Sequence, residues 1–196
     1  EGVTSIGKYA FYDCSRLYKV VNYSDLGISR GSTNHGYVAY YAEKVVNIDD
    51  LSAVGDYSFY TSNGVHYLEH YSGNDLTLVL PNNYKGENYK IGDYAFYYCS
   101  NLTSITIPES VTSIGSSAFS DCSSLTAVHI SSIDAWCKIS FKGYSSNPLY
   151  YAKNLYLNGE LVTELIIPES VTSIGDEAFS GCSSLTAITI PENSQL

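Results

Sequence analysis

The sequence IPESVTSIGSSAFSDCSSLT fills residues Ile107–Thr126, and it returns at Ile167–Thr186 with three positions changed. Less regular copies occupy Ser5–Leu17 and Ile91–Leu102, and a fainter one occupies Val54–Phe59. A repeated unit this short cannot bury an apolar face by itself, so it must stack on its neighbours. The repeat therefore predicts a solenoid built from stacked units.

The spacing of the units is informative. Each unit carries an Ile or Val before a Gly, at Ile6, Val54, Ile91, Ile114 and Ile174. The steps between these positions are 48, 37, 23 and 60 residues, so a short unit of 23 residues alternates with longer units that carry insertions. A period near 23 lies within the range of roughly 20–29 residues of leucine-rich repeats. We expect extended units at about residues 23–53 and 131–160.

Apolar and small polar residues alternate at the start of the unit. Ile105 and Ile107 alternate with Ser104 and Thr106, which is the period of two typical of a half-buried strand. Pro108 ends this strand, because proline has no N–H to donate to the next rung. The pattern places the two isoleucines in the core and the two polar residues on the outer face of a sheet.

After the strand, Val111 and Ile114 return to the core, and Ala118–Cys122 is long enough for only one helical turn. The predicted fold is a leucine-rich-repeat solenoid, with a parallel β-sheet on one face and short helical or 3-10 turns opposite. The expected strands are Leu17–Asn22, Leu76–Leu80, Leu125–Ile130, Leu165–Ile167 and Leu185–Ile190, with further candidates at Val45–Ile48 and Leu155–Leu157. Asn63-Gly64, between Tyr57–Tyr60 and Val65–Tyr71, predicts a hairpin, because Asn-Gly is the strongest short hairpin signal.

Composition limits the partners. The chain has 196 residues, and its ten Lys and Arg against twenty Asp and Glu give a net charge of −10. This charge disfavours a nucleic-acid partner or an anionic membrane surface. No apolar run approaches the roughly 20 residues needed to cross a bilayer, so membrane insertion is not expected. We expect residues 1–196 to form a single solenoid, and we interpret the chain as a piece of a longer repeat protein because it begins without Met inside a unit.

The repeat motif I-P-x-S-V-T-S-I-G-x-x-A-F-x-x-C-S-x-L closely resembles the BspA-like leucine-rich repeats of surface proteins from host-associated bacteria and some mucosal protozoa. It fits residues 91–130 and 161–191 almost letter for letter and residues 1–22 well, whereas 44–90 and 131–160 fit less tightly. The resemblance implies an extracellular or cell-surface protein that adheres to host or matrix proteins. It implies no catalytic residue and no cofactor, so we expect no enzyme. The alternative is a structural spacer that displays another domain of the full-length protein.

Two surfaces are candidates for binding a protein partner. Alternate residues of each strand are expected to point into the core, so the residues between them point outward on one face of the sheet. The outward residues of successive rungs are Val79, Thr106, His129, Ile166 and Thr189. The rival site lies in the tyrosine-rich insertions, because Tyr is enriched where proteins meet partners. Its residues are Tyr37, Tyr40, Tyr41, Tyr144, Tyr150 and Tyr151.

Two further slots of the repeat hold Phe and Cys. We expect a stacked aromatic spine under the outer turns, made of Phe11, Phe59, Phe96, Phe119 and Phe179. The equivalent cysteines, Cys14, Cys99, Cys122 and Cys182, point the same way on successive rungs and, together with Cys137, are expected to be buried free thiols.

One motif suggests metal chemistry. His66-Tyr-Leu-Glu-His70 matches H-x-x-E-H, a zinc-peptidase signature that requires a stable helix. Here the motif lies in a run that predicts a strand, where residues four apart are separated by about 13 Å. A surface strand is therefore the expectation, with no metal site. Trp136 and Phe141 would suit a carbohydrate platform, but inside an apolar unit they are expected to belong to the core.

Overall fold

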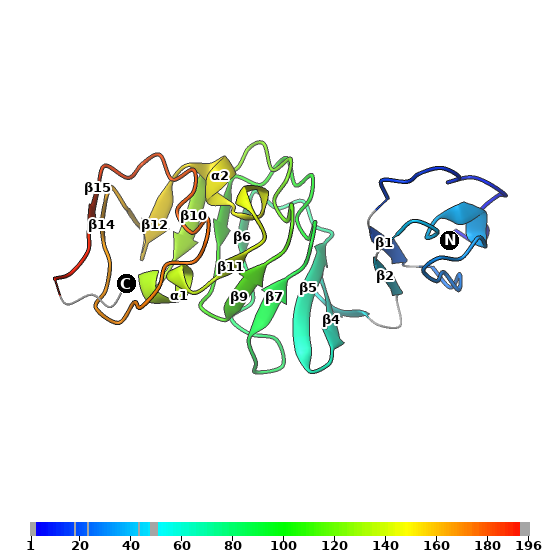
Figure 1. Cartoon of the computed structure of the whole chain (residues 1–196), viewed down its shortest axis with the longest axis horizontal. Helices are drawn as coiled ribbons and strands as arrows, with labels where there is room; N and C mark the ends of the chain where they lie inside the picture. Colours follow the sequence, from blue (N-terminus) through cyan, green and yellow to red (C-terminus); the bar gives the residue numbers. More distant parts are fainter. Residues whose placement is uncertain (1–2, 18, 23, 43, 48–50, 193–196) are drawn as a thin grey trace. The chain divides into compact units, whose positions relative to one another are not determined.

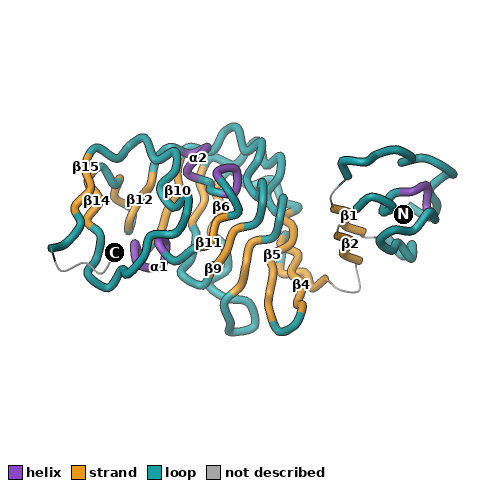
Figure 2. The backbone as a smooth tube through the Cα atoms, viewed as in Figure 1, coloured by secondary structure: helices purple, strands orange, loops and turns teal. Residues whose placement is uncertain are grey.

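The computed structural model describes residues 3–192 except 18, 23, 43 and 48–50 (Figure 1). The chain divides into two compact units, Glu1–Ser52 and Ala53–Leu196, and each has its own hydrophobic core. Strands and loops make up nearly all of both units (Figure 2). None of the helices in the described part of the chain has the length and apolar character that a bilayer crossing requires.

The first unit contains the parallel strands β1 (Lys19–Asn22) and β2 (Lys44–Asn47), paired in register. Between them lies the 3-10 helix η1 (His35–Tyr37). The strands predicted at Leu17–Asn22 and Val45–Ile48 are confirmed, with Ile48 outside the described residues. The core of this unit consists of Val20, Ile28, Val38, Ala39 and Ala42.

A five-stranded sheet forms one flank of the second unit (Figure 1). In spatial order its strands are β13 (Glu160–Leu161), β12 (Leu155–Leu157), β10 (Ala127–Ile130), β8 (Ser104–Thr106) and β6 (Thr77–Val79). β12, β10, β8 and β6 are parallel and in register, whereas β13 returns antiparallel beside β12. The parallel strands predicted in this part of the chain are therefore confirmed.

A second sheet lies on the opposite flank, where the sequence pattern predicted only short turns and a return of Val111 and Ile114 to the core. Its strands, in spatial order, are β11 (Ser140–Phe141), β9 (Val111–Ile114), β7 (Tyr89–Ile91), β5 (Val65–Tyr71), β4 (Tyr57–Ser62) and β3 (Leu51–Val54). Val111 and Ile114 are buried as expected, and Ile114 aligns with Ile91 and Phe141. The strand arises because the backbone groups between these inward side chains find partners on neighbouring rungs.

The predicted hairpin is confirmed as β4–β5, an antiparallel pair that meets at Asn63-Gly64. Asn63 and Gly64 have φ values of 50° and 75°, which matches a turn with positive φ at both central residues. β5 also pairs in parallel with β7, so the hairpin joins the second sheet.

The remaining elements lie toward the end of the chain. The insertion after β10 contains α1 (Ile133–Cys137), η3 (Tyr144–Ser146) and α2 (Leu149–Ala152). α1 begins where the Ser132 hydroxyl accepts a hydrogen bond from the Ala135 N–H at 3.1 Å. β14 (Glu164–Ile166) and β15 (Ala187–Thr189) form a separate parallel pair, which confirms the last two predicted strands.

Side chains alternate between core and surface as predicted, except in the last rung. Ile105, Val128 and Leu165 are at most 2% exposed. Ile188 holds the equivalent position but is 58% exposed, so its expected core position is wrong. No further rung among the described residues packs over β15, and the apolar face of this strand therefore remains open.

The predicted aromatic spine is confirmed in its middle and wrong at its start. Phe96 and Phe119 are fully buried, and their rings stack at a centroid distance of 5.0 Å with an interplanar angle of 2°. Phe59 is also buried, but it stacks on Tyr84 at 4.2 Å because its strand belongs to the hairpin. Phe11, in the smaller first unit, is 38% exposed.

A ladder of side-chain hydrogen bonds precedes the strands of the five-stranded sheet. The Thr103 hydroxyl donates to the Leu76 carbonyl at 2.7 Å, and the Thr126 hydroxyl donates to the Thr103 carbonyl at 3.1 Å. The Asn154 amide continues the series by donating to the Thr126 carbonyl at 3.0 Å. These bonds help to hold successive rungs in register.

Candidate binding surfaces

The five-stranded sheet brings three of the predicted face residues into one row. Thr106 aligns with Val79 on one side and with His129 on the other. Val79 is 65% exposed, and Thr106 and His129 are half-buried. The row extends to Tyr156, which aligns with His129 and stacks on its ring at 4.7 Å with an interplanar angle of 21°. These four residues are named the sheet row.

Sequence reasoning did not select Tyr156, although period two in Leu155–Leu157 turns it outward. The structure places the other two predicted face residues elsewhere. Ile166 and Thr189 align with each other in the β14–β15 pair, which belongs to a different sheet. The five-stranded sheet ends at antiparallel β13, where Leu161 aligns with Tyr156.

An open groove of about 490 Å³ follows the carboxyl ends of four rungs. Thr106 and His129 contribute to it from the strands. The segments after the strands contribute polar side chains, namely Asn82, Glu109, Ser110, Ser131 and Asn158. Loops that follow parallel strands meet at one edge of the sheet, so residues distant in the sequence share this lining. Neither the motifs nor the spacing predicted this groove.

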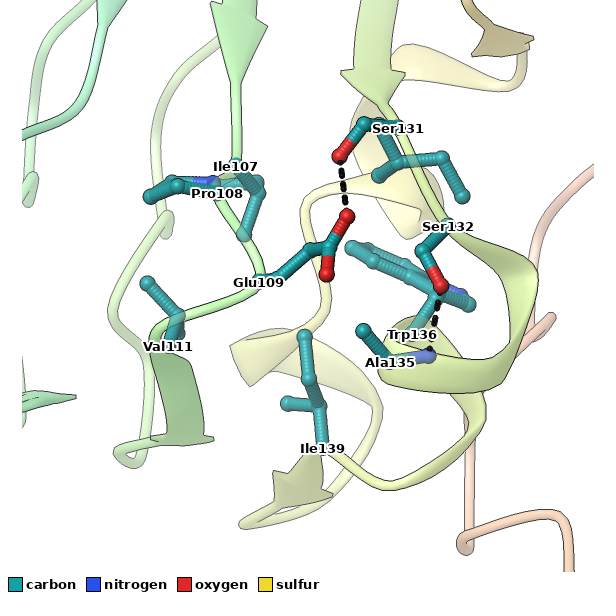
Figure 3. A pocket seen from close by; sticks show the side chains of 10 residues that line it. Ile107, Pro108, Glu109, Val111, Ser131, Ser132, Ala135, Trp136 and Ile139 are labelled. Carbon is teal, nitrogen blue, oxygen red and sulfur yellow. Dashed lines mark hydrogen bonds between the residues drawn. The ribbon is translucent and has the colours of Figure 1, made fainter. Parts of the chain in front are cut away.

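Adjacent rungs are joined at the groove by a hydrogen bond from the Ser131 hydroxyl to the Glu109 carboxylate at 2.9 Å (Figure 3). Beside it lies a small cavity of about 10 Å³, lined by apolar side chains that include Val111, Trp136 and Ile139. That volume accommodates one water molecule at most. Of these two neighbouring spaces, only the larger groove has room for a ligand bigger than water.

Ser110 is an unusual part of the groove lining. It is 8% exposed, and its buried hydroxyl oxygen has no hydrogen-bond partner among the described residues. An unpaired buried hydroxyl costs about 1–3 kcal/mol.

The rival tyrosines of the first unit form one aromatic cluster. Tyr37 packs against Tyr40 at a centroid distance of 5.3 Å, and Tyr40 packs against Tyr41 at 4.8 Å. Tyr9 and Tyr12 extend the cluster through contacts with Tyr37 at 5.6 and 5.2 Å. Partial desolvation, followed by the nearby Asp13 carboxylate, raises the pKa of Tyr41.

The tyrosines of the second unit form a similar cluster. Tyr150 contacts Tyr144 at 5.0 Å and Tyr151 at 5.2 Å. The Lys153 ammonium lies 4.8 Å from the centroid of the Tyr150 ring. The Tyr151 hydroxyl lies 3.3 Å from the Ser120 hydroxyl, and burial raises the pKa of Tyr151. Each set of predicted tyrosines is thus clustered within its own unit.

The zinc-peptidase signature lies on a strand, as predicted. Both histidines belong to β5, but the expected surface position of this strand is wrong, because His66 is buried and His70 is half-buried. Its Nδ1 lies 2.7 Å from the Thr61 hydroxyl, and its Nε2 lies 3.4 Å from Glu87 Oε2. Among the described residues, no group of three His, Cys, Asp or Glu side chains is arranged to hold a metal ion.

The cysteines are free thiols, as predicted, but their burial differs. Cys122, Cys137 and Cys182 are buried, Cys99 is half-buried, and Cys14 is exposed because the first unit has a smaller core. The Cys122 thiol donates to the Phe96 carbonyl at 3.2 Å. Its hydrogen bond with Cys99 and its burial raise the pKa of Cys122.

The predicted core position of Trp136 is confirmed. Trp136 is 1% exposed and its indole N–H donates to the Ala178 carbonyl at 2.8 Å. Phe141, also buried, packs against it at a centroid distance of 5.4 Å. Neither ring is available as an exposed platform.

Comparison with protein families finds six copies of the BspA type leucine rich repeat region, over residues 1–71, 39–133, 71–155 and 150–196. Comparison with curated proteins finds no match for the chain.

Solved structures similar to the chain include a leucine-rich cell surface protein from Faecalibacterium prausnitzii, with 27% identity and a TM-score of 0.44 over 74% of this chain and 43% of that one. The T. pallidum leucine-rich repeat protein has 20% identity and a TM-score of 0.49 over 71% of each chain. A leucine-rich repeat protein from Bacteroides capillosus has 26% identity and a TM-score of 0.42 over 72% of this chain and 99% of that one.

Proposed function

Because the chain belongs to the BspA-type leucine-rich repeat family, we propose that it is an extracellular or cell-surface module that adheres to a host or matrix protein. The family implies a repeat module for protein interaction, and the sheet row is the observation that supports a binding face on this chain. Val79, Thr106, His129 and Tyr156 lie side by side on four consecutive rungs.

The chemistry of the sheet row suits a protein surface. The row contains no Asp, Glu, Lys or Arg, so a partner covers it without removing a full charge from water. The backbone below it is paired in register and braced by the Thr103 and Thr126 hydrogen bonds. A face held in this way loses little conformational entropy when it binds.

Two sets of substitutions distinguish this face from the rival site. An immobilised panel of host matrix proteins is first tested for binding to the intact chain by biolayer interferometry. For any protein that binds, Val79→Glu with Thr106→Glu places two charges in the sheet row and is expected to weaken affinity at least about tenfold. Tyr150→Ala with Tyr151→Ala removes the tyrosine cluster of the second unit and is expected to leave affinity within about twofold.

The opposite result would refute the sheet-face site: affinity unchanged by the two glutamates and abolished by the two alanines. Ile166→Glu with Thr189→Glu tests the separate β14–β15 pair in the same assay. Circular dichroism of each variant controls for loss of fold. If no matrix protein binds the intact chain, the adhesion proposal itself fails.

The structural spacer is the second candidate. The hydrogen-bond ladder through Thr103, Thr126 and Asn154 favours it, because a rigid array also suits the display of another domain. A spacer predicts that the intact chain binds none of the panel. The two glutamate substitutions in the sheet row would then leave binding by the full-length protein unchanged.

A further inference from the structure

The groove at the carboxyl ends of the rungs has a lining that differs from the flat sheet row. Its polar side chains come from four segments, with Asn82, Glu109, Ser131 and Asn158 each following a different strand. They include amide groups that both donate and accept hydrogen bonds, a hydroxyl, and a carboxylate that accepts. A volume of about 490 Å³ lies within the range of roughly 300–1,000 Å³ typical of small-molecule sites.

An aromatic ring borders these polar groups. Tyr156 covers one side of the His129 ring by stacking on it, and the residue aligned with His129 on its other side is the small Thr106. Both His129 and Thr106 line the groove. Rungs are separated by about 4.8 Å, so a ring-shaped group above Thr106 would continue the stack of Tyr156 and His129.

The charge of the lining limits the ligand. The groove residues include Glu109 and no Lys or Arg, and the whole chain carries a net charge of −10. An anionic ligand would therefore meet repulsion without a compensating cation. The Glu109 carboxylate already accepts a hydrogen bond from Ser131 and has the capacity to accept more from hydroxyl groups.

From these observations we propose that the groove binds a neutral saccharide of about two rings. One pyranose ring stacks its apolar face on His129 above Thr106, and its hydroxyls bond to Glu109 and to the amides of Asn82 and Asn158. This assignment goes beyond protein adhesion and does not depend on it, since the ligand and most of the contacting residues are different.

The chain supplies a matched control for the test. Glu109 and Glu169 occupy the same position of the repeat, in Ile107–Ser110 and Ile167–Ser170, and both are exposed. Glu109 lines the groove and Glu169 does not. Glu109→Gln keeps an oxygen that can accept the hydrogen bond from Ser131, so the fold is expected to survive the change.

The experiment titrates the isotope-labelled chain with lactose, maltose and cellobiose and follows backbone amide shifts by NMR. At least one neutral disaccharide is expected to bind with a Kd in the millimolar range and to shift residues 106–110, 129–131 and 158–159. Glu109→Gln and His129→Ala are each expected to weaken this binding about tenfold or more, and Glu169→Gln to change it by less than about twofold. A sulfated disaccharide is expected to cause no saturable shift.

Three results would overturn the proposal. The first is the absence of saturable shifts with every neutral disaccharide at about 50 mM. The second is an equal effect of Glu109→Gln and Glu169→Gln. The third is tighter binding of the sulfated disaccharide, or of an uncharged Ser/Thr octapeptide, at the same residues. Failure of protein adhesion leaves this titration unaffected, so the two proposals fail separately.

Discussion

At the scale of single residues, the rings of Phe96 and Phe119 show how the repeat builds its core. The same slot in adjacent units places two fully buried rings 5.0 Å apart and nearly parallel. Phe11 fills this slot in the first unit and is 38% exposed. The packing of neighbouring rungs, and not the motif alone, therefore determines how much each ring contributes to the stability of the fold.

Phe119→Ala is expected to lower the free energy of unfolding by about 3–5 kcal/mol, because it empties a packed aromatic site. Urea denaturation followed by circular dichroism measures the change. Phe11→Ala is the matched control and should cost less than about 1 kcal/mol. A loss of less than about 1 kcal/mol for Phe119→Ala would show that its ring does not belong to the core.

The cysteine thiols should differ in reactivity according to their burial. In the folded protein at neutral pH, Cys14 is expected to react with a thiol reagent much faster than Cys122, Cys137 or Cys182, because only an exposed thiolate reacts readily. After denaturation without reductant, all five cysteines should titrate. A titration that finds only one or three would show that disulfides exist in the protein.

Titration of Cys137 should make the stability of the folded protein depend on pH. Burial raises the pKa of Cys137 to about 11, from an ordinary value of 9.0. The folded protein therefore holds this proton more tightly than the unfolded chain does. The stability that the protonated thiol contributes is complete below pH 9.0 and is lost as the pH rises toward about 11. Cys137→Ala should flatten the fall of Tm across this interval, and an unchanged fall would contradict the assignment.

At the scale of elements, side-chain hydrogen bonds between rungs help to hold the register of the five-stranded sheet. Thr103 and Thr126 each donate to a carbonyl one rung earlier, and Thr186 repeats the pattern toward Thr163 at 2.9 Å in the β14–β15 pair. The same position of the repeat is thus used in both sheets. Asn154 replaces Thr where the insertion alters the unit.

Thr126→Val removes one hydroxyl of the ladder while keeping the β-branched shape. It is expected to cost about 1 kcal/mol in the free energy of unfolding, the usual net value of such a hydrogen bond. Thr77→Val, an exposed change on β6, is the control and should stay within about 0.5 kcal/mol. Equal effects of the two substitutions would mean that the ladder adds no stability.

At the scale of the whole molecule, we propose that residues 1–196 form a single solenoid, although they divide into two compact units. In a short repeat array, neighbouring repeats usually unfold together in one transition. The intact chain is therefore expected to show one calorimetric transition. Val20→Ala, in the core of the first unit, and Phe119→Ala, in the second, should both lower the same Tm. Two transitions, each moved by only one of the substitutions, would contradict a single cooperative solenoid.

The sequence by itself determined the stacked parallel strands, because the motif recurs every 23 residues or with insertions. It also determined the direction of most side chains, because that direction depends on a local period of two. It also predicted the Asn63-Gly64 hairpin and the core position of Trp136 from local chemistry. Only the tertiary structure decided that β9 belongs to a second sheet and that Tyr156 stacks on His129. It also separated Ile166 and Thr189 from the sheet row and formed the groove. These features depend on which strands lie beside one another once the units are stacked, and a local pattern contains no information about that stacking.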